Sequence, residues 1–140
     1  NNYQAFLASN TNYPRKGMIY YRIGQALLQL QRTDPQAQQN ITYIDDAITA
    51  LSNITETSMD NPTQFAQALI LLGQAFEEKA NFYLKNGDEA LWNRYLKDAE
   101  NHYRRVGQTN IPDKLQEAKT YIDNIISRVN SRNELADIKP

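Results

Sequence analysis

The chain has 140 residues, 41% of them hydrophobic, and a net charge of −1 from 15 basic and 16 acidic residues. A chain of this length buries a real core as one domain. Its balanced charge argues against nucleic acid or an anionic membrane surface as a partner. It has no cysteine, which excludes disulfides, thiol catalysis and zinc–thiolate sites. No apolar run approaches the roughly 18 residues of a membrane span, so we expect no direct membrane insertion.

The start of the chain and its amide content bear on its origin. The first two residues are Asn1 and Asn2, with neither a Met nor an apolar signal region before the first helical pattern. This start is typical of a processed or trimmed piece of a longer protein. The abundance of Asn and Gln favours an extracytoplasmic protein or an AT-rich genome. The compartment itself stays open.

Six segments show apolar residues at helical spacing, separated by turn formers. We predict helices over residues 3–9, 15–31, 35–54, 62–85, 89–106 and 112–132. Alternation of period two is absent and the connections are short, so the fold class is all-α, with five or six helices. We assign residues 1–132 to a single helical domain and residues 133–140 to a frayed tail.

The helix ends carry capping signals. Asp34, Asn61 and Asp88 are placed to cap the helices that follow them, the first two before a proline at the first turn. Gly87 and Gly107 are placed to end helices, because glycine readily takes the left-handed conformation there. In the segment 15–31 the inward stripe is predicted to leave Tyr21 out and to consist of Ile19, Tyr20, Ile23, Leu27 and Leu30.

Two predicted helices carry a glycine in the same local context. Residues 23–27, Ile-Gly-Gln-Ala-Leu, match residues 72–76, Leu-Gly-Gln-Ala-Phe, and the glycines are 73 − 24 = 49 positions apart. A glycine inside a helix costs about 1 kcal/mol against alanine, so each position needs a packing reason, usually another helix crossing close to the backbone. The repeat indicates two stacked helix pairs of about fifty residues each.

These motifs resemble the tetratricopeptide family. The family's first helix has the pattern large-x-x-aliphatic-Gly-x-x-aromatic, which residues 20–27 and 69–76 match. Its second helix has Ala-x-x-x-aromatic-x-x-Ala, which residues 47–54 and 99–106 match loosely. The chain departs from the family in the spacing between the two patterns, which is 23 residues from Gly24 to Ala47 and 26 from Gly73 to Ala99, where the family has about a dozen. Longer helices or inserted turns must absorb the difference, and a simple helical bundle with accidental self-similarity is the alternative.

The resemblance implies antiparallel helix-pair repeats, a solenoid whose first helices line a concave groove. Positions flanking the two glycines would face that groove and bind a protein or peptide, with amides bonding its backbone and aliphatic side chains offering pockets. For Ile70 and Leu71 the alternative is that they belong to the core of a helix buried all round. The predicted groove residues are Tyr21, Arg22, Gln25, Leu28, Gln29, Ile70, Leu71, Gln74, Glu77 and Glu78.

No residue pattern nominates an enzyme. His102 is the only histidine; Asp98 lies one turn before it, but no nucleophile accompanies the pair. No metal or cofactor site is predicted. We expect a non-enzymatic adaptor or scaffold that binds a partner protein or peptide, within a larger assembly. The alternatives are a small helical bundle with its own ligand or metal site and a purely structural segment of a longer repeat array.

Overall fold

The computed structural model describes residues 16–138. Within this range the chain forms α-helices and short 3₁₀ turns and no strand, so the all-α prediction is confirmed. The helix predicted over residues 3–9 lies outside the described part of the chain. The five α-helices are α2 (Lys16–Thr33), α3 (Thr42–Ser52), α4 (Pro62–Lys85), α5 (Glu89–Arg105) and α6 (Pro112–Ile138), and the 3₁₀ turns are η1 (Ala37–Gln39), η2 (Glu56–Ser58) and η3 (Val106–Thr109).

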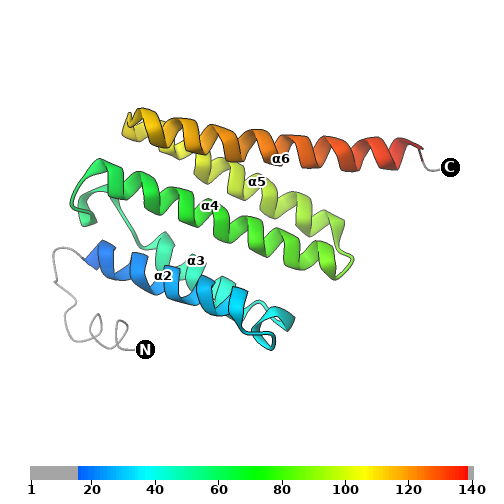
Figure 1. Ribbon diagram of the computed structural model, residues 1–140, viewed down its shortest axis with the longest axis horizontal. Coiled ribbons are helices and arrows are strands. Elements are labelled where there is room, and N and C mark those ends of the chain that lie inside the picture. The colour runs from blue at the N-terminus through cyan, green and yellow to red at the C-terminus, as the bar shows by residue number, and fades with distance from the viewer. Residues whose placement is uncertain (1–15, 139–140) are drawn as a thin grey trace.

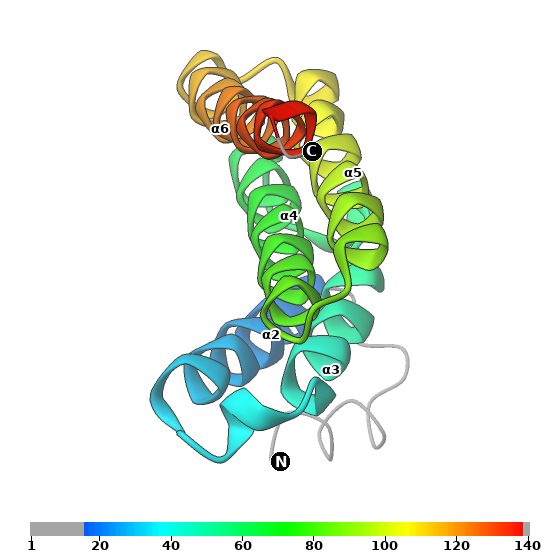
Figure 2. The ribbon, with the colours of Figure 1, turned by 90° about the vertical axis from the view of Figure 1, so that its right-hand side faces the viewer.

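Successive helices run in alternate directions and form two layers (Figure 1). Viewed along the helices, α2, α4 and α6 lie in one layer, and α3 and α5 lie in the other (Figure 2). Helix α2 packs mainly on α3, and α4 packs mainly on α5, while α3 also contacts α4 and α5 also contacts α6. Helix α4 touches all four other helices and is therefore the centre of the described fold.

The core follows from the composition of α4. Its apolar run from Ala68 to Leu72 is buried on every side, with each residue at most 7% exposed. A helix that is apolar all round is stable only when neighbours cover all its faces, and α4 has neighbours in both layers. Large side chains from α5, including Trp92, Leu96 and Tyr103, complete the cluster.

Several predicted caps are confirmed. The Asn61 side chain accepts a hydrogen bond from the Gln64 amide at 2.9 Å and starts α4. The Asp88 carboxylate accepts one from the Leu91 amide at 3.0 Å and starts α5. Between these helices Gly87 has φ +84°, the left-handed conformation that glycine adopts without strain.

The prediction that Asp34 starts the next helix is wrong. Its carboxylate accepts a hydrogen bond from the Gln36 amide at 3.0 Å and closes a local turn instead. The turn η1 follows, Asn40 is extended, and α3 begins only at Thr42. The buried Gln31 amide fixes this detour, because its Nε2 donates to the carbonyl of Ala37 at 3.0 Å.

Two other helix ends differ from prediction. Helix α5 passes into η3, and the left-handed residue that terminates η3 is Asn110, with φ 55°, rather than Gly107. Helix α6 continues to Ile138, so the predicted tail is helical over residues 133–138.

The inward stripe of α2 also differs from prediction. Leu30 is 44% exposed, whereas Leu28 is 1% and Tyr21 is 9% exposed. Three leucines lie within four residues at this point, so periodicity alone could not choose among them. Ile126 of α6, a predicted inward residue, is 41% exposed.

Both repeated glycines sit under a side chain of the following helix. A Cβ at Gly24 would lie 2.6 Å from Leu51 Cγ of α3, and a Cβ at Gly73 would lie 2.7 Å from Tyr103 Cδ1 of α5. Real Cβ contacts are essentially never this short. Each glycine therefore lets the partner helix approach the backbone, as the sequence pattern predicts.

Candidate binding groove

An open groove runs between α2 and α4. Its volume is about 550 Å³. Four glutamines, two from each helix, are its most frequent lining residues, and the floor is aliphatic. The lining residues are Tyr21, Arg22, Gln25, Ala26, Leu28, Gln29, Arg32, Gln67, Leu71 and Gln74.

The floor and rim of the groove differ in exposure. Leu28 and Leu71 form the floor and are 1% and 7% exposed. Arg22, Gln25 and Gln29 on the α2 rim are exposed to solvent. An extended peptide in such a groove would bury apolar groups on the floor and exchange backbone hydrogen bonds with amides on the rim.

The two rims differ in how firmly their amides are held. On α2 the Gln25 amide has only long contacts of 3.5 Å, to the Tyr21 hydroxyl and from Arg22. On α4, Gln74 donates to the Tyr121 hydroxyl of α6 at 2.7 Å. The α2 rim therefore remains free to bond a ligand, while the α4 rim is oriented by α6.

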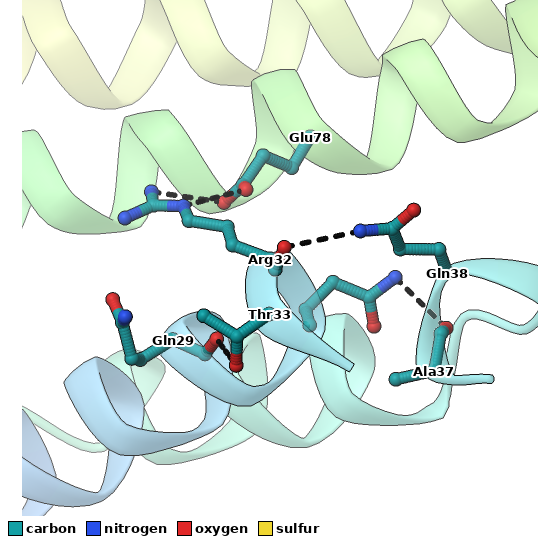
Figure 3. Close-up of polar contacts among 7 residues, drawn as sticks. Gln29, Arg32, Thr33, Ala37, Gln38 and Glu78 are labelled. Atoms are coloured by element: carbon teal, nitrogen blue, oxygen red, sulfur yellow. Dashed lines mark hydrogen bonds and ion pairs between the residues drawn. The ribbon is translucent and has the colours of Figure 1, made fainter. Parts of the chain in front are cut away.

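A charged pair closes one end of the groove. Arg32, at the end of α2, reaches across to Glu78 of α4, with Nε at 2.9 Å from Oε1 and Nη2 at 3.2 Å from Oε2 (Figure 3). The hydrogen bond with Glu78 is the main cause that raises the pKa of Arg32. The two-pronged geometry fixes the spacing of α2 and α4 at this end.

The structure brings seven of the ten predicted groove residues together. They are Tyr21, Arg22, Gln25, Leu28, Gln29, Leu71 and Gln74. Ile70 is 0% exposed and belongs to the core, so of the two roles considered for this residue, groove or core, the structure has the second. Glu78 lies beside the groove rather than in it, held by Arg32 and facing the neighbouring hollow beside Phe82.

Glu77 is the third predicted residue outside the groove. Its carboxylate accepts hydrogen bonds from the Tyr103 hydroxyl of α5 and from Arg128 of α6. Burial, followed by the bond to Glu77, raises the pKa of Tyr103 far above its ordinary value, so its hydroxyl remains a donor. Glu77 therefore links three helices and has no free oxygen directed to a partner in the groove.

Three lining residues were missed from the sequence: Ala26, Arg32 and Gln67. Helical spacing could have found the last two, because Arg32 follows Gln29 by three positions and Gln67 precedes Leu71 by four. The prediction followed the residues nearest the glycines and did not extend one turn further along each helix.

The other chemical candidate, His102, is held structurally. Its ring stacks on Phe76 with centroids 5.0 Å apart, and Arg105 Nη1 lies 3.0 Å from Nδ1. Burial and the Arg105 charge lower the pKa of His102, against a smaller opposite effect of Asp98. Among the described residues, no group of three or more His, Asp or Glu side chains is placed to hold a metal ion.

Comparison with known proteins gives no relative to set beside this geometry. No protein-family model matches the chain, and no curated protein or solved structure is similar enough to count as a match. None of the helices in residues 16–138 has both the length and the apolar character needed to cross a bilayer.

Proposed function

We propose that the chain is a non-enzymatic adaptor that binds an extended segment of a partner protein in the groove between α2 and α4. The observation that carries the proposal is the groove's lining: amide side chains on both rims over a floor of Leu28 and Leu71. Backbone groups of a peptide need donors and acceptors together, and an amide supplies both. The charged lining residues are Arg22 and Arg32, and Arg32 is already paired with Glu78. Within the described chain the lining therefore offers one unpaired cation, Arg22, rather than the cluster of cations that would favour a phosphate over a peptide.

We further propose that α2–α3 and α4–α5 are equivalent, tetratricopeptide-like units and that α6 begins a third. The two glycine contacts support this, because Leu51 and Tyr103 hold the same place in the second-helix pattern, four residues after Ala47 and Ala99. The units absorb their extra length differently. The first inserts the turn η1, and the second lengthens its first helix to the 24 residues of α4.

The double substitution Gln25→Glu and Gln29→Glu tests the groove. Both side chains are exposed on the α2 rim, so folding is retained, while the loss of two amide donors and the added negative charge weaken binding of a peptide backbone. Peptides are selected from a displayed random library on the wild-type chain, and their affinities for both proteins are measured by fluorescence anisotropy. We expect dissociation constants to rise about tenfold or more, since one lost hydrogen bond is worth about 1 kcal/mol.

The matched control is Gln108→Glu with Gln116→Glu, two exposed glutamines outside the groove that give the same change in net charge. This control should bind the selected peptides as the wild type does. Equal weakening by both variants, or failure to select any peptide that the α2 variant discriminates, would refute the proposal. A lowered melting temperature of the α2 variant would show that Gln25 and Gln29 act in folding instead.

The alternative of a small helical bundle with its own ligand or metal site has no supporting feature among the described residues. The groove between α2 and α4 is open to solvent, and the described His, Asp and Glu side chains form no metal-ligand cluster. The alternative of a structural segment in a longer array has one favourable observation. Ile126 and Leu135, both on α6, are 41% and 55% exposed.

A further inference from the structure

A second groove, between α5 and α6, is independent of the one between α2 and α4. Its volume is about 510 Å³. The floor and the α6 wall are aliphatic, from Leu96, Ile125, Ile126 and Val129. Leu96 and Ile125 are 1% and 2% exposed, whereas Ile126 is 41% exposed, so the apolar surface rises from the core into solvent.

The charged residues of this groove all lie on its α5 side, and the uncompensated ones are cations. The charged lining residues are Arg94, Lys97 and Glu100, all on α5. Glu100 is neutralised by Arg104 at 2.8 Å. Within the described chain neither Arg94 nor Lys97 has an ion pair; the Arg94 guanidinium lies 5.7 Å from the centroid of the Tyr95 ring. The α5 rim therefore presents two uncompensated cations beside an apolar floor, while the α6 rim ends in the neutral Asn130.

The layer order shows which kind of element fits here. Helices α3 and α5 form one layer, each beside helices of the layer that contains α2, α4 and α6 (Figure 2). The groove is lined by residues of α5 and α6 alone, so an element bound in it lies alongside both, as a further helix of the α3–α5 layer would. A helix bound in this groove would pack against α5 and α6. Helix α5 is placed in a similar way, because it packs against α4 and its Arg105 lies beside α3.

We propose that the groove between α5 and α6 docks an amphipathic helix of a partner protein, with an aliphatic stripe and acidic residues along one flank. The stripe covers Leu96, Ile126 and Val129. The acidic flank lies along Arg94 and Lys97, which sets the orientation of the helix and excludes a basic one. This surface does not depend on the peptide groove between α2 and α4.

The test uses two synthetic helical peptides of about five turns. They carry the same leucine stripe, with Glu flanking it in one and Lys in the other. Binding to the full chain is measured by fluorescence anisotropy, and the site is located by amide chemical shifts in NMR spectra. We expect the acidic peptide to bind at least about tenfold more tightly, with shifts at Leu96, Ile126 and Val129. Equal binding, no binding, or shifts confined to Tyr21 and Gln29 would overturn the proposal.

Charge reversal supplies the matched variants. Arg94→Glu with Lys97→Glu should abolish or invert the preference for the acidic peptide. Lys85→Glu with Lys119→Glu makes the same change in net charge at exposed positions outside the groove and should preserve it. A similar loss in both variants would reduce the effect to overall charge and overturn the proposal.

A second copy of the chain is the competing occupant. Sedimentation velocity of the chain alone, with and without Ile126→Asn, decides between them. We expect a monomer in both. A dimer that Ile126→Asn dissociates would show that another copy fills the groove, and the partner helix would be ruled out.

Discussion

At the scale of single residues, the contact between Gly73 and Tyr103 gives the sharpest prediction. Alanine at position 73 would gain about 1 kcal/mol of helix propensity. Its Cβ would, however, overlap the Tyr103 ring, which is 1% exposed and also bonded to Glu77, so the ring has no room to move. Overpacking of this kind costs about 1–3 kcal/mol, and the cost is larger where the two helices must move apart. After the gain of about 1 kcal/mol is subtracted, we expect Gly73→Ala to lower the free energy of unfolding by about 1–2 kcal/mol in urea titrations.

Gly107→Ala is the control for this substitution. A Cβ at Gly107 would meet no atom within 4 Å, and its φ is not positive. The unfolding free energy should therefore stay within about 0.5 kcal/mol of wild type. If Gly73→Ala proves as harmless as Gly107→Ala, the close approach of α4 and α5 is not what requires the glycine.

His102 gives a prediction for pH. Its pKa in the folded chain is below the ordinary 6.5, because burial and Arg105 disfavour the charged ring. The unfolded chain therefore binds a proton at higher pH than the folded chain does. The resulting stability is complete above pH 6.5 and is lost as the pH falls from there towards the lowered pKa. Urea titrations between about pH 7.5 and 5.5 should show this decline.

His102→Phe keeps a ring to stack on Phe76 but cannot titrate. The chain has no other histidine, so we expect the variant to lose the part of the decline that lies just below pH 6.5. The assignment fails if both proteins lose stability with the same slope, or if wild type becomes more stable as the pH falls. Any constant offset between the two proteins reports packing and is separate from this test.

At the scale of helices, the sequence predicted correctly those helix starts that depend on a hydrogen bond between residues only three positions apart. Asn61 and Asp88 cap α4 and α5 through amides three residues ahead, a contact contained in the sequence pattern. Asp34 carries the same signal before a proline but closes a turn, because Gln31 holds the Ala37 carbonyl from inside the core. That bond depends on how α2 is rotated against its neighbours, which residues 34–37 do not specify.

The groove residues show the same difference between contacts within a helix and contacts between distant residues. All five residues predicted around Gly24 line the groove, because helix periodicity fixes which side chains share a face, but only Leu71 and Gln74 of the five predicted around Gly73 do. Glu77 and Glu78 have the right spacing but bond to Arg128 and Arg32, which are 51 and 46 positions away. Among 15 basic residues, no local pattern selects these two. Tyr21 was missed as a core residue for the related reason that its burial, at 9% exposed, depends on how α2 packs on its neighbours and not on the periodicity of α2 alone.

At the scale of the whole molecule, stability should fall from α4 outwards. Helix α4 contacts every other helix of the described chain, whereas α6 rests on α4, α5 and η3 and carries exposed apolar residues. In stacked helical arrays each unit is stabilised by its nearest neighbours, so end helices open first. Native-state hydrogen exchange should find the slowest amides around Ile70 and faster ones along α6.

Arg128 tests whether α6 opens as a separate unit. Arg128→Met would remove the α6 member of the ion pair with Glu77, including the buried Arg128 Nε that has no hydrogen-bond partner, while Glu77 keeps the hydrogen bond from the Tyr103 hydroxyl. Removing one member of a half-buried pair should lower the opening free energy of α6 by about 1–2 kcal/mol. The amides around Ile70 should lose less. Glu100→Ala, which breaks only the pair with Arg104 on one helix, should change the opening free energy of α6 by less than about 0.5 kcal/mol. Equal losses at Ile70 and throughout α6 in Arg128→Met would show instead that the described helices unfold as one unit.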